Sequence, residues 1–177
     1  MKIRIYSLLV VNTIIAVLGI YLWMTYLPEI PDTIALGRDA DGSITARVPS
    51  KSIWILPLLF AGIHLIGIFA ASSNLKIKFK NKDGFEKSVP EEKRTPVYSL
   101  IKESVYMFVL VMGFVILYIQ SSLVLLGLEK VKKFHFYPIL ILFAIFVLVT
   151  TFYKKAIDKK AESIIKLYSN GAADGKQ

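Results

Sequence analysis

The run SLLVVNTIIAVLGIYLWMTYL, residues 7–27, decides the fold class. It contains no formal charge, and at about 1.5 Å per residue a helix of this length crosses a hydrocarbon core of about 30 Å. The run ends in Tyr21, Trp23 and Tyr26, an aromatic belt typical of a membrane interface. A cleaved signal peptide would instead end in small residues. The sequence therefore favours an uncleaved first transmembrane helix.

Three further apolar runs extend this prediction to an all-α integral membrane protein with four transmembrane helices in a bundle. The composition agrees, because 55% of the residues are hydrophobic, against about 45–50% in soluble domains. We expect one membrane domain over residues 1–153 and a cytoplasmic amphipathic helix and tail over 154–177, with Asn170-Gly171 ending that helix. The predicted spans cover about residues 6–27, 52–72, 103–128 and 134–153.

Charge predicts the orientation of these spans. Sixteen of the 22 Lys and Arg residues lie before the first span, between the second and third, or after the fourth. The positive-inside rule then places both termini in the cytoplasm of a cell-membrane protein, with residues 27–51 outside. The same rule accounts for the net charge of +9 without nucleic acid as a partner. The chain has no Cys, which excludes disulfides and thiolate metal sites, and we predict no cofactor.

The basic segment between the second and third spans predicts a possible small β-hairpin near residues 75–88. Leu75, Ile77 and Phe79 alternate with lysines, and the turn-forming pair Asp83-Gly84 follows. Two interpretations stay open for this segment. It contacts anionic lipid or a cytoplasmic protein, or it is a basic loop that only fixes the topology.

The outer stretch LPEIPDTIALGRDADGSITARVPSK, residues 27–51, predicts an ordered extracellular loop. Loops of this length between spans are usually either functional or disordered. RDADG resembles part of a calcium loop but lacks the terminal Glu, so we predict no metal here and favour a solvated turn. The candidate ligand- or partner-binding residues of the stretch are Pro31, Asp32, Asp39, Asp41 and Lys51.

Three polar residues fall inside the predicted spans: Asn12, His64 and Gln120. An ionisable residue within the membrane is a functional-site hypothesis by default. The alternative for each is one hydrogen bond between packed helices. The sequence contains none of the common hydrolase, metalloprotease or nucleotide-binding signatures, so we predict no catalytic residue.

The outer stretch also resembles a bacterial family. Tyr26-Leu27-Pro28, Ile30-Pro31-Asp32-Thr33-Ile34, Gly42 and Ser50-Lys51 are similar to the domain of unknown function at the N-terminus of SdpI-type immunity proteins, over about residues 1–72. Ala35, Gly37 and Thr45 stand where that pattern has Pro, His and Asp. The resemblance implies a Gram-positive-type cytoplasmic-membrane protein whose relatives act in immunity to secreted toxic peptides or in membrane signalling.

We therefore expect a non-enzymatic membrane protein, surrounded by lipid, for immunity or for envelope signalling or sensing. Its outer loop would contact an extracellular peptide, and its basic face a cytoplasmic protein. The first alternative is a transporter or transporter-accessory protein with a membrane partner subunit, in which Asn12, His64 and Gln120 line a polar path. The second is a membrane enzyme that uses outer carboxylates such as Asp32.

Overall fold

The computed structural model describes residues 2–38, 44–72 and 82–174. Within these ranges the chain is mostly helical, and four helices are long and apolar enough to cross a membrane. This confirms the predicted helical class and indicates a multi-pass membrane protein by length and composition. The four helices are α1 (Lys2–Tyr26), α2 (Ile55–Ser72), α4 (Thr95–Gly127) and α5 (Tyr137–Asp174).

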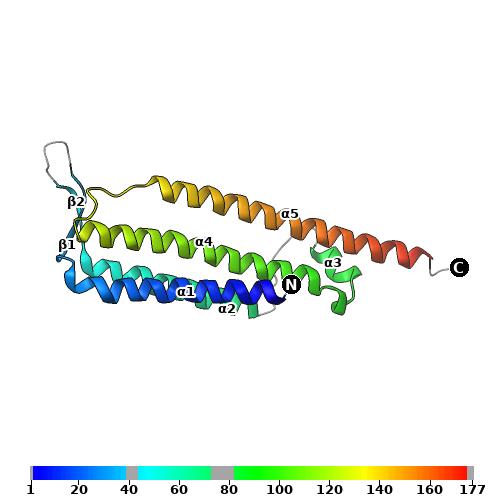
Figure 1. Ribbon diagram of the computed structural model, residues 1–177. Coiled ribbons are helices and arrows are strands. Elements are labelled where there is room, and N and C mark those ends of the chain that lie inside the picture. The colour runs from blue at the N-terminus through cyan, green and yellow to red at the C-terminus, as the bar shows by residue number, and fades with distance from the viewer. Residues whose placement is uncertain (1, 39–43, 73–81, 175–177) are drawn as a thin grey trace.

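Helices α1, α2 and α4 form a three-helix bundle, and α5 packs against α4 (Figure 1). Helices α1 and α4 run in the same direction, and α2 and α5 run in the opposite one. The bundle centre contains Ile15, Phe60, Val109 and Ile116. Close approach depends on Gly113, because a Cβ there would lie 2.6 Å from two ring carbons of Phe60.

The predicted ordered loop is in fact a β-hairpin. Strands β1 (Thr33–Arg38) and β2 (Ile44–Pro49) pair antiparallel, with a register shift after Ala35. Short 3-10 helices flank them, η1 (Leu27–Glu29) before and η2 (Ser50–Trp54) after. We call the end of the bundle that carries this hairpin the hairpin end, and the opposite end, with the N-terminus and α3, the basic end (Figure 1).

The hairpin predicted near residues 75–88 is wrong where the structure describes it. Residues 82–88 form a helix, α3 (Lys82–Ser88), followed by η3 (Glu91–Lys93), and residues 75–81 lie outside the described ranges. Phe85 and Val89 are one helical turn apart, and both are fully buried against α4 and α5. That packing outweighs the turn propensity of Asp83-Gly84.

Helix α5 is continuous from Tyr137 to Asp174, so the fourth apolar run and the amphipathic segment are one helix. The prediction that Asn170-Gly171 ends the helix is wrong, since α5 passes through both residues. Ile157, Ala161 and Ile164 face α3 and the start of α4, where they complete the core at the basic end.

Candidate functional site

The hairpin is packed onto the bundle by its apolar face. Ile34 of β1 is only 1% exposed and lies in a cluster with Trp23 of α1, Ile53 of η2, and Leu123 and Leu126 of α4. Alternate residues of a strand point to opposite faces, so β1 fixes Ile34 inward while its neighbours face outward. The hairpin is therefore part of the folded core at this end.

Two hydrogen bonds from Ser50 close the base of the hairpin. The backbone N–H of Ser50 donates to the Asp32 carbonyl at 2.9 Å, and the Ser50 hydroxyl donates to the same oxygen at 3.2 Å. Ser50 is 4% exposed, which leaves little water to compete for these bonds. The serine of the Ser50-Lys51 pair thus has a structural role in this chain.

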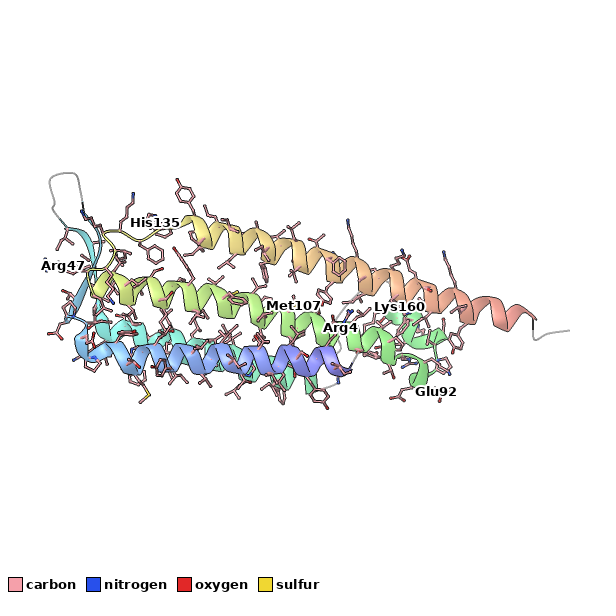
Figure 2. The ribbon with its side chains drawn as sticks, in the orientation of Figure 1. Arg4, Arg47, Glu92, Met107, His135 and Lys160 are labelled. Atoms are coloured by element: carbon pink, nitrogen blue, oxygen red, sulfur yellow. The ribbon has the colours of Figure 1, made fainter. Side chains whose placement is uncertain are left out.

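The connector between α4 and α5 is tied to the same hairpin. The Phe134 N–H donates to the Leu36 carbonyl of β1 at 3.2 Å, and the Tyr118 hydroxyl of α4 donates to the His135 carbonyl at 2.7 Å. Figure 2 shows Arg47 and His135 at the hairpin end, and Arg4 and Lys160 toward the basic end. The connector and the hairpin together cap the bundle.

The predicted binding residues divide into two groups. Pro31, Asp32 and Lys51 are exposed at the base of the hairpin, whereas Asp39 and Asp41 lie outside the described residues. Sequence reasoning missed Arg47, an exposed cation on β2. Among the described residues, no group of three His, Cys, Asp or Glu side chains could hold a metal ion.

The intramembrane polar residues are buried at helix interfaces. The Asn12 amide donates to the Tyr106 carbonyl at 3.2 Å, and the Gln120 amide donates to the Gly19 carbonyl at 2.6 Å. Both bonds join α1 to α4. The His64 Nε2 lies 3.4 Å from the Thr13 hydroxyl and joins α2 to α1.

The structure brings His64 and Asn12 near the same level of α1 and leaves Gln120 apart. Tyr106 and Gln120 are separated by fourteen residues of α4, or about 21 Å along the helix. The cavity beside Gln120 measures about 10 Å³, which is at the lower limit for one water molecule. The three residues therefore do not line one open path in this conformation.

Sequence reasoning also missed a buried acid at the basic end. Glu103 of α4 is 7% exposed and accepts a 2.8 Å hydrogen bond from the Tyr153 hydroxyl of α5. The Arg4 guanidinium of α1 lies 3.9 Å from the same carboxylate oxygen. The available signal was an acid at the start of an apolar run. The structure makes Glu103 the junction of three helices.

Comparison with known proteins identified no relative. No family model, no curated protein and no solved structure matches this chain. The likeness to the SdpI-type N-terminal domain therefore remains a prediction from the residues quoted above.

Proposed function

We propose that this chain is a non-enzymatic, multi-pass protein of a bacterial cytoplasmic membrane that acts in immunity to toxic peptides or in envelope signalling or sensing. The hairpin end faces outward and binds the peptide or envelope component. The basic end faces the cytoplasm, in keeping with the distribution of Lys and Arg residues along the chain.

One observation carries this proposal: the hairpin packs on the outer ends of α1 and α4, leads into α2, and is bonded to the connector that precedes α5. It packs on Trp23 of α1 and on the end of α4, it leads through η2 directly into α2, and it holds the connector to α5 through Leu36. A ligand on the hairpin would therefore act on α1 and α4 through buried contacts, on α2 through η2, and on α5 through the connector. Such contiguous contacts are what coupling between two ends of a bundle requires.

The edges of the hairpin support a peptide as the ligand. Strand β1 accepts a backbone hydrogen bond from the connector at Leu36. In the part of the chain that the structure describes, no backbone hydrogen bond from another segment reaches the outer edge of β2. Extended peptides commonly bind by adding a strand to such an edge. Arg47 and Lys51 beside it would attract acidic groups of the peptide.

The test reverses the charge of these two exposed residues and leaves the buried contacts of Ile34 unchanged. We expect the Arg47→Glu, Lys51→Glu double variant to lose protection of a sensitive bacterial host challenged with secreted peptide toxins, or to lose the signalling response. Survival at equal membrane levels of the protein is the measurement. The matched control is Lys130→Glu, Lys132→Glu, which makes the same charge change on the exposed connector. Equal protection by the two double variants would contradict the proposal.

A transporter or transporter-accessory function is the second candidate. It is favoured by two buried polar atoms, Asn12 Oδ1 and His64 Nδ1, that have no hydrogen-bond partner among the described residues. Buried polar atoms without partners are costly and often mark functional positions. If this candidate holds, His64→Leu should abolish solute or proton flux into proteoliposomes. Thr151→Val, on the exposed part of α5, serves as the control. Full flux in His64→Leu would reject the transport function.

A further inference from the structure

Helix α5 is held to the bundle mainly through α4. In the apolar window of α5 none of the residues is buried, against 44% of the corresponding window of α4. The residues of α5 that are buried in a core, Ile157, Ala161 and Ile164, all lie toward the basic end. The apolar residues in that window of α5 are therefore open to lipid, including those on the side that faces α4.

A groove occupies the part of this interface nearer the basic end. Its volume is about 350 Å³, within the range of about 300–1,000 Å³ typical of small-ligand sites. Val105 and Phe108 of α4 form one wall, and Val149 and Ile157 of α5 form the other.

The hydroxyls that line the groove do not make it a polar site. Ser104 donates to the Ile101 carbonyl, Thr150 donates to carbonyls one turn back in α5, and Tyr153 donates to Glu103. Their protons are committed to the protein, so a polar solute would find few free donors. An acyl chain needs no hydrogen-bond donor. It fills the space beside the apolar walls and makes van der Waals contacts with them.

Charged side chains line the end of the groove nearer the basic end. Lys154 lines it one turn beyond Thr150, and Lys155, Lys159 and Lys160 follow as exposed residues of α5. Asp158 also lines the groove. Lysines outnumber acids on this part of the helix, and ammonium groups next to a bilayer attract anionic headgroups.

We propose that this groove binds one anionic phospholipid. An acyl chain lies between α4 and α5, and the Lys154 ammonium pairs with the headgroup phosphate. The bound lipid contacts Tyr153 and so lies beside the bond that joins α5 to Glu103. This proposal concerns the basic end and is independent of the function proposed for the hairpin.

The test uses native mass spectrometry of the full-length protein titrated in detergent with phosphatidylglycerol or phosphatidylcholine. We expect the first phosphatidylglycerol to bind about fivefold more tightly than phosphatidylcholine, the effect of about one lysine at the headgroup level. Lys154→Gln should bring the two affinities close together, while Lys132→Gln at the hairpin end should leave the preference unchanged. Equal affinities in the unmodified protein would overturn the proposal.

A second measurement separates the groove from the general lipid-facing surface. Because the chain has no Cys, Val149→Cys and Leu148→Cys each give a unique thiol, in the groove and on the exposed face of α5 respectively. Both variants are folded first and then alkylated with N-cyclohexylmaleimide. Alkylation at position 149 should displace the tight lipid, and alkylation at 148 should not. Two results would instead show that lipid is not the occupant. One is that the alkylated Val149→Cys variant still binds the tight lipid. The other is that this variant has the mass of a dimer and its thiol does not react.

Discussion

Gly113→Ala should lower the free energy of unfolding by about 1–3 kcal/mol, the usual cost of overpacking a tight core. The new Cβ would lie 2.6 Å from Phe60 ring carbons and 3.3 Å from Ile15 Cγ2. Phe60 is 2% exposed and Ile15 is 5% exposed, so neither side chain can turn away without moving a helix. The change should therefore separate α2 from α1 and α4. Equilibrium unfolding in mixed micelles, followed by circular dichroism, measures the loss.

Gly62→Ala is the matched control, since it makes the same change on α2 where no atom lies within 4 Å of the new Cβ. It should match or slightly exceed the stability of the parent chain, because Ala is the better helix former. Equal unfolding of the two variants would show that Gly113 does not lie at a close contact between α4 and α2.

Tyr153→Phe should have a similar effect at the other end of the molecule. It removes the 2.8 Å hydrogen bond to Glu103 and leaves a carboxylate that is 7% exposed with one donor fewer. Hydrogen bonds to charged groups contribute about 1.5–3 kcal/mol, and the loss is largest where water cannot replace the donor. The variant should release α5 from α4 before the rest of the bundle unfolds. Limited proteolysis of residues 154–168 and thermal unfolding both report this step.

Tyr137→Phe provides the comparison on the same helix, because Tyr137 is 76% exposed. It should leave both the proteolysis rate and the unfolding midpoint unchanged. An unchanged Tyr153→Phe protein would mean that apolar contacts alone hold α5, and that Glu103 is not the junction of the helices.

The four spans could be predicted from the sequence because the membrane makes hydropathy a strong constraint. A backbone in hydrocarbon must satisfy its own hydrogen bonds, so a long uncharged run such as residues 7–27 becomes a helix. The interfacial position of Trp23 was read from the same pattern, and the ring lies in the cluster under the hairpin in contact with Trp54. Asn12, His64 and Gln120 were placed within these runs, and the structure adds that all three are buried between helices.

The elements outside the spans could be predicted less well. The local sequence around Phe85 and Val89 does not indicate that both residues pack against α5, about seventy residues further along the chain. The sequence of the outer stretch predicted an ordered loop but not its two strands. The strands depend on contacts of Ile34 with residues of α1 and α4. The burial of Glu103 could not be predicted, because its hydrogen-bond donor Tyr153 and its ion-pair partner Arg4 are remote in sequence.

The sequence by itself determined the helical spans, their number and the basic character of one end. Those properties depend on composition within single segments, which a chain cannot change by folding. The tertiary structure alone decided the packing of the hairpin on α1 and α4, the helical form of α3 and the groove between α4 and α5. Each of these depends on contacts between distant segments, whose favourable packing energy exists only when the helices are already side by side.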